Sequence, residues 1–139
     1  MPKGKHLLLI DDDTHAREGY HKYLSGKGFR VHASAGGIDA LAFVKASTPD
    51  LVVLDLALPD VDGWEVARRL KNDQRTRDIP IIAFSGRTLQ HEQVSALRAG
   101  CDVYLTKPCA PDKLLGAIRK LLGLAGPRVD LSDIDPEPY

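Results

Sequence analysis

Short apolar runs alternate five times along the chain with segments in which apolar residues recur at helical spacing. The runs lie at 6–11, 29–33, 51–54, 79–84 and 103–106. Most of them are nearly continuous in Leu, Ile and Val, as expected of strands buried on both faces of a parallel sheet. The run at 29–33 instead alternates apolar residues with Arg30 and His32, which is typical of an edge strand with one wetter face.

Helices are predicted after each of these strands, at 14–26, 36–49, 64–72, 90–99 and 112–122. Thr14 is the expected N-cap of the first helix, and Pro49 is expected to end the second. Ile38 opens the apolar stripe of the second helix. The stripe of the fourth helix is the weakest, because Val94 and Leu97 provide most of it.

Five strand–helix units with right-handed crossovers predict an α/β fold. The expected architecture is a doubly wound, five-stranded parallel sheet in the order 2-1-3-4-5, flavodoxin-like, with helices on both faces. At 139 residues the chain fits one domain, which we assign to residues 5–123. The periodic pattern stops at 124, and residues 124–139 are predicted to be a flexible, polar, acidic tail.

Composition excludes several classes of function. Lys and Arg total 19 and Asp and Glu total 19, so no net field favours direct binding of nucleic acid or of an anionic membrane. No apolar stretch approaches the roughly 20 residues that cross a bilayer. The first residues lack a secretory apolar region, so a cytoplasmic location is expected. Cys101 and Cys109 have no zinc-ligand spacing and are expected to be buried free thiols.

Charged residues follow three of the predicted strands at their carboxyl ends, where doubly wound sheets form their ligand crevice. Asp11 and Asp12 follow the first strand, Asp55 the third and Lys107 the fifth. Two carboxylates at ~4 Å repel by about 4 kcal/mol at an effective dielectric near 20, so a proton or a cation must neutralise them. Oxygen ligands without His or Cys favour Mg²⁺, and the Lys107 ammonium suits a phosphoryl group, to which the Ser85 hydroxyl could also donate.

Four segments together resemble the receiver domain of two-component response regulators over residues 5–123. They are the apolar run that ends in three aspartates at 11–13, the stretch from Asp55 to Gly63, the Ser-Gly pair at 85–86, and the stretch 104–108. The resemblance implies that Asp55 is a phosphoacceptor that receives a phosphoryl group from a sensor histidine kinase or a phosphotransfer protein. It implies no enzymatic activity beyond the domain's own phosphoryl transfer and dephosphorylation.

The resemblance also implies a metal site for the cofactor Mg²⁺. Asp12 and Asp55 would contact the ion directly, Asp11 would act through a water molecule, and the backbone carbonyl of Ala57 would supply a further ligand. The peptide bond between Lys107 and the proline that follows it is expected to be cis, as it typically is in this family.

A conformational switch is the third implication. Ser85 and Lys107 would contact the phosphoryl group, and Tyr104 would rotate inward when the domain is phosphorylated. The fourth helix, fifth strand and fifth helix would then present a changed face to a protein effector, or to a second copy in a phosphorylation-dependent homodimer. Ala57 and Arg87 stand where the family tunes phosphoryl lifetime.

Three alternative functions fit these residues less well. A phosphatase of the haloacid dehalogenase type needs a second Asp two residues after the nucleophile, where Ala57 stands, and a cap domain. A flavodoxin-like nucleotide-binding module needs a Gly-rich loop after the first strand, where three aspartates stand. A degenerate receiver would lack part of the acidic set, which is complete here. The sequence leaves open whether this is a stand-alone receiver or part of a longer protein, and which kinase and effector it meets.

Overall fold

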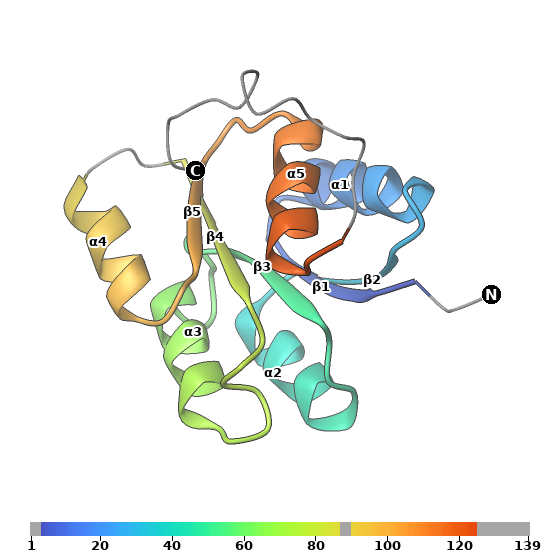
Figure 1. The fold of residues 1–139 in the computed structure, drawn as a ribbon. Coiled ribbons are helices and arrows are strands. Elements are labelled where there is room, and N and C mark those ends of the chain that lie inside the picture. Colours follow the sequence, from blue (N-terminus) through green and yellow to red (C-terminus); the bar gives the residue numbers. More distant parts are fainter. Residues whose placement is uncertain (1–3, 87–89, 125–139) are drawn as a thin grey trace.

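The computed structural model describes residues 4–86 and 90–124. Five strands form one sheet with helices on both faces (Figure 1). The strands are β1 (His6–Ile10), β2 (Arg30–Ser34), β3 (Leu51–Asp55), β4 (Ile81–Ser85) and β5 (Val103–Thr106), and the helices are α1 (Thr14–Gly26), α2 (Gly37–Ala46), α3 (Gly63–Asn72), α4 (Gln90–Arg98) and α5 (Pro111–Leu121). Neighbouring strands are parallel in the order β2-β1-β3-β4-β5, which confirms the predicted topology.

The two faces of the sheet carry separate hydrophobic clusters, because successive strand residues point to opposite faces. On β3, Leu51 and Val53 belong to the cluster that includes buried residues of α1 and α5. Val52 and Leu54 belong to the cluster covered by α2, α3 and α4. Every residue of β3 is buried, which agrees with its continuous apolar sequence and its central position in the sheet.

Two predicted element ends differ from the structure by more than one residue, and β2 is displaced by one. β4 begins at Ile81 rather than at 79, because Pro80 has no N–H to donate to the ladder; its carbonyl still accepts the Val52 N–H at 3.0 Å. α2 ends at Ala46, before Pro49, since the residue preceding a proline is disfavoured in a helix. β2 is shifted by one residue at each end.

The predicted apolar stripes of α2 and α4 are wrong in part. Three large apolar side chains that were expected to face the core are exposed, namely Ile38 (63%), Val94 (39%) and Leu97 (44%). α2 instead buries Ala40 and Val44, and α4 buries Ala96. Leu41 and Phe43 of α2 are partly buried against the same core cluster, so only part of the predicted stripe points to solvent.

The remaining composition-based expectations concern the membrane, the cysteines and the tail. Over residues 4–86 and 90–124, the helices are too short or too polar to span a bilayer. Cys101 and Cys109 are buried free thiols, as predicted, and burial raises the pKa of Cys101 to about 12. Of the predicted tail, residues 125–139 lie outside the described part of the chain, so its flexibility and the proposed domain boundary stay predictions.

Candidate functional site

The parallel pairing of β1 with β3 brings two carboxylates together at the carboxyl ends of these strands. Ile10 pairs with Leu54, so that Asp11 and Asp55 follow at neighbouring positions. Carboxylate oxygens of Asp11, Asp12 and Asp55 all lie within 4.8 Å of one another. Asp11 is fully buried and Asp55 is 5% exposed, whereas Asp12 is exposed to solvent. Two buried carboxylates this close need a compensating positive charge.

Lys107 supplies a positive charge to this acidic pair. Its Nζ donates hydrogen bonds to Asp11 Oδ2 at 2.7 Å and to Asp55 Oδ2 at 3.2 Å. The ammonium also lies 5.6 Å from the centre of the Phe84 ring, which belongs to β4, the strand between β3 and β5. Burial by itself lowers the pKa of Lys107, but the hydrogen bond to Asp11 and the charges of Asp55 and Asp11 raise it overall. The peptide bond from Lys107 to Pro108 is cis, as the family resemblance implies.

The charge of the Asp55 carboxylate is only partly compensated. Burial raises its pKa above the ordinary value of 3.8, and the nearby charge of Asp11 adds to the rise. The Ala57 N–H, which donates to Asp55 Oδ1 at 2.9 Å, and the Lys107 ammonium act in the opposite direction. A further cation beside this carboxylate would therefore be stabilised.

The donor set suits a hard divalent cation. The cluster offers carboxylate oxygens only, and one of its members, Asp12, is open to solvent. Mg²⁺ prefers one or two protein carboxylates and keeps several of its waters, which an open, oxygen-rich site permits. The residues of this pocket therefore fit Mg²⁺ better than a metal that prefers nitrogen or sulfur ligands.

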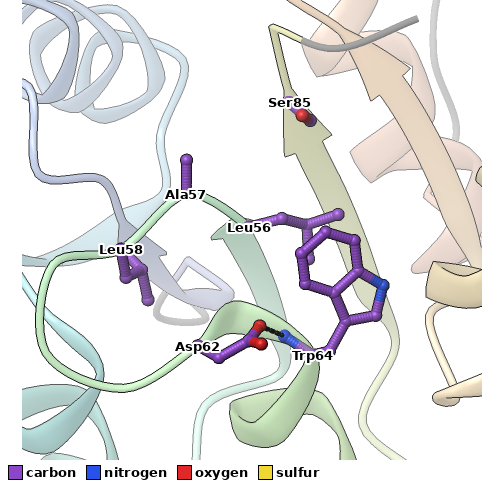
Figure 2. Close-up of a pocket in the computed structure, with 6 residues that line it drawn as sticks. All are labelled: Leu56, Ala57, Leu58, Asp62, Trp64 and Ser85. Atoms are coloured by element: carbon purple, nitrogen blue, oxygen red, sulfur yellow. Dashed lines mark hydrogen bonds between the residues drawn. The ribbon is translucent and has the colours of Figure 1, made fainter. Parts of the chain in front are cut away.

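A cavity of about 340 Å³ opens beside the carboxyl end of β3. Figure 2 shows the residues that line it: Leu56, Ala57, Leu58, Asp62, Trp64 and Ser85. Ser85 ends β4 and is only 2% exposed, and its carbonyl accepts the Lys107 N–H at 2.7 Å. On the opposite side, Asp62 caps α3 by accepting the Trp64 backbone N–H at 2.8 Å, and the Trp64 indole lines the cavity. The structure thus brings Ser85 to the predicted site.

The two remaining predicted residues have different outcomes. Tyr104 is 5% exposed and packs in the cluster on the α3–α4 side of the sheet, so its ring is already buried here. Its proposed rotation stays a prediction. Arg87 lies outside the described residues, and its proposed effect on phosphoryl lifetime stays a prediction as well.

Two residues outside the predicted site shape the acidic loop, and the sequence pattern did not single out Arg17. Asp13, rather than Thr14, is the N-cap of α1, and its carboxylate accepts the His15 N–H at 3.0 Å. Arg17 Nη1 donates to the backbone carbonyl of Asp11 at 2.8 Å. The helix dipole disfavours a cation near a helix N-terminus. The place of Arg17 in the sequence, close to the start of α1, was therefore the one indication that its side chain binds a group outside this helix.

Comparison with known proteins identifies relatives of this arrangement. A family model for the response regulator receiver domain matches residues 7–119. The response regulator MprA of Mycobacterium avium (strain 104) is 37% identical over 128 residues, which cover 92% of this chain and 55% of the relative. MprA of Mycobacterium leprae (strain TN) is 40% identical over 116 residues, which cover 84% of this chain and 50% of the relative. The chain therefore spans about half the length of the curated relatives it matches.

Solved structures share the fold over nearly their whole length. A putative response regulator from Chloroflexus aurantiacus J-10-fl has a TM-score of 0.83 and 29% identity, covering 87% of this chain and 99% of that one. The receiver domain of the sensor histidine kinase PA1611 from Pseudomonas aeruginosa PAO1 has a TM-score of 0.80 and 29% identity, covering 86% and 98%. That structure has a magnesium ion coordinated in its active-site cleft.

Proposed function

This chain belongs to the response regulator receiver family of two-component signalling, and we propose that it accepts a phosphoryl group on Asp55 from a histidine kinase or a phosphotransfer protein. One observation carries the proposal. The buried Asp55 carboxylate forms a cluster with two further carboxylates and with the Lys107 ammonium, which lies 3.2 Å from Asp55 Oδ2. A nucleophile, a metal-binding acidic pair and a phosphate-binding cation are the groups that phosphoryl transfer requires.

The transfer is a displacement at phosphorus. A carboxylate oxygen of Asp55 attacks the phosphorus of a phosphohistidine, and an O–P bond forms as the N–P bond breaks. The electron pair of the broken bond stays on the imidazole nitrogen, which takes up a proton. Lys107 stabilises the charge on the phosphoryl oxygens while its 2.7 Å hydrogen bond to Asp11 holds the ammonium in place.

We propose Mg²⁺ as the cofactor of this transfer. Asp12 and Asp55 would bind the ion directly and Asp11 through a water molecule, and the carbonyl of Ala57 would complete the protein ligands. When bound, the ion neutralises negative charge on the transferring group and orients that group for in-line attack. The acidic cluster supports this assignment. The Asp11 carboxylate is fully buried and accepts a hydrogen bond from Lys107, whereas Asp12 is exposed to solvent.

The output of the domain is a change at its α4–β5–α5 face. A phosphoryl group adds roughly −1.5 to −2 charges, and Ser85 and Lys107 would move toward it. We propose that the Tyr104 ring follows Ser85, and that the altered face controls a protein effector or forms a homodimer. The exposed Val94 and Leu97 side chains of α4 support a protein partner on this face.

We propose a regulator rather than an enzyme that turns over an external substrate. A phosphatase of the haloacid dehalogenase type would need a carboxylate two residues after Asp55, and the exposed Ala57 stands there. The domain would catalyse only its own phosphorylation and dephosphorylation. The proposed kinase partner and the balanced net charge favour a cytoplasmic role without direct contact with nucleic acid or membrane.

Intact-mass measurement tests the proposal. Incubation with a small-molecule phosphodonor and Mg²⁺ should add the mass of one phosphoryl group to the wild-type protein. Addition of EDTA should prevent this gain, and Asp55→Ala should abolish it. Asp73→Ala, which alters an exposed aspartate in the loop after α3, serves as the matched control and should be labelled normally. Full labelling of Asp55→Ala would refute the assignment of the acceptor.

A further inference from the structure

The N-terminus of α2 is capped by a residue from another part of the chain. The local cap residue, Gly36, has no side chain with which to bind the first N–H groups of the helix. Asp60, in the loop after β3, takes this role: Oδ1 accepts the Gly37 N–H at 2.9 Å and Oδ2 accepts the Ile38 N–H at 3.0 Å. Hydrogen bonds from Ile38, Gly37 and Val61 lower the pKa of Asp60 to about 2, so it stays anionic at neutral pH.

Gly36 and Gly37 lie too close to neighbouring residues for a larger side chain at either position. A Cβ on Gly36 would lie 2.7 Å from Asp60 Oδ2. A Cβ on Gly37 would lie 2.9 Å from Val66 Cγ2 and 3.0 Å from Val61 Cβ. The two glycines therefore permit a close approach between this loop and α2, which lets the exposed Asp60 reach the first N–H groups of the helix.

The same helix end is also tied to the other carboxylate-bearing loop. Ser34 Oγ donates to Asp39 Oδ2 at 2.8 Å, and Asp39 belongs to the first turn of α2. The Ser34 carbonyl accepts the Asp11 N–H at 3.0 Å. The first turn of α2 thus connects by hydrogen bonds to Asp11 on one side and, through Asp60, to the loop that follows Asp55 on the other.

We propose that Asp60 is a positioning residue for the metal site. By capping α2, it holds the loop 56–62 and the Ala57 backbone in the place that cation binding requires. Asp60 takes no part in the acidic cluster itself, whose members among the described residues are Asp11, Asp12 and Asp55. The inference rests on the proposed function and deepens it, since it explains how two loops separated in sequence keep one ligand geometry.

Calorimetric titration with Mg²⁺ at fixed ionic strength tests this role on the full chain. Asp60→Ala should weaken Mg²⁺ binding about tenfold, as loss of a residue that orients metal ligands typically does. Asp60→Asn keeps an acceptor oxygen and should weaken binding less, by about threefold. Asp73→Ala is the control, because Asp73 is also exposed and also accepts a backbone N–H, that of Arg75 at 2.9 Å, and it should bind Mg²⁺ as the wild type does.

A metal-free measurement separates positioning from direct ligation. Amide hydrogen exchange at Ile38 and Ala57 should be faster in Asp60→Ala than in the wild type, and unchanged in Asp73→Ala. Wild-type affinity and exchange in Asp60→Ala would overturn the proposal, as would equal weakening by both alanine variants, which would indicate a general charge effect. If Asp60→Ala fails to fold, Asp60→Asn decides by the same two readouts, and wild-type values there overturn the proposal. Absence of Mg²⁺ binding in the wild type would instead overturn the proposed metal site.

Discussion

At the residue scale, the Asp55 carboxyl is held in surroundings that favour its neutral form. Burial raises its pKa, and the Asp11 charge raises it further. The folded state therefore binds this proton more tightly than the unfolded chain does. By linkage, stability falls as the pH rises from the ordinary value of 3.8 toward the higher folded pKa, and the loss is complete above that window.

Asp55→Asn should therefore stabilise the metal-free protein. We expect the melting temperature at pH 7 to rise by about 3 °C, because the variant removes the poorly compensated charge, while Lys107 keeps its shorter bond to Asp11. The difference should disappear near pH 3, where the wild-type carboxyl is protonated in both states. Thermal unfolding followed by circular dichroism at several pH values measures this. A variant less stable than the wild type at pH 7 would contradict it.

Lys107→Ala should have the opposite effect. It leaves the buried Asp11 and Asp55 carboxylates without their cation, and loss of one partner of a buried ion pair lowers the free energy of unfolding by about 3 kcal/mol. Mg²⁺ should restore part of this loss, since it supplies positive charge to the same carboxylates. Urea unfolding with and without Mg²⁺ measures both effects, with Lys113→Ala at an exposed position as control. Unchanged stability in Lys107→Ala would contradict the ion-pair account.

At the scale of elements, the sequence pattern correctly predicted the strands that consist of continuous apolar runs. The central strand β3 is buried throughout, as its composition indicates. The predicted apolar faces of α2 and α4 were wrong in part, because Ala40 and Ala96 are buried while Ile38 is exposed, and hydrophobicity alone does not distinguish these positions. The capping of α2 by Asp60 joins residues 22 positions apart, and no local spacing encodes such a contact.

The start of α3 depends on a glycine that permits close approach to the end of β3. A Cβ on Gly63 would lie 2.5 Å from Leu56 Cα and 2.9 Å from the Asp55 carbonyl oxygen. Backbone atoms yield little, so Gly63→Ala should lower the free energy of unfolding by about 3 kcal/mol and weaken phosphorylation at Asp55. Gly116→Ala is the matched control, because nothing lies within 4 Å of its added Cβ in α5, and it should stabilise by up to about 1 kcal/mol. Chemical denaturation compares the two, and equal stability of both variants would contradict the steric argument.

At the scale of the whole molecule, topology assembles a site from distant parts of the chain. Lys107 meets Asp11 across 96 positions and Asp55 across 52. This meeting was predictable, because parallel strands in the order 2-1-3-4-5 place their carboxyl ends along one edge. The protonation preference of Asp55 and the Arg17 contact to the Asp11 carbonyl were not, since both depend on burial and side-chain direction that strand order leaves open.

The proposed switch should be visible in the emission of Trp64, the single tryptophan of the chain. Its indole lines the same cavity as Ser85, so movement of Ser85 toward a phosphoryl group changes the surroundings of the ring. Phosphorylation should therefore shift or quench the emission of the wild type. Ser85→Ala should still be phosphorylated but show a smaller change, and an equal change in both proteins would argue against a role for Ser85.

Chemical mapping of the modified residue tests the central claim most directly. Borohydride reduces an aspartyl phosphate to homoserine, so reduction after phosphorylation in Mg²⁺ marks the acceptor permanently for peptide sequencing by mass spectrometry. The account predicts homoserine at position 55, in place of Asp55, and its absence when Mg²⁺ is withheld. Conversion at Asp11 or Asp12 instead, or a phosphoryl group recovered on a side chain outside this pocket, would contradict it.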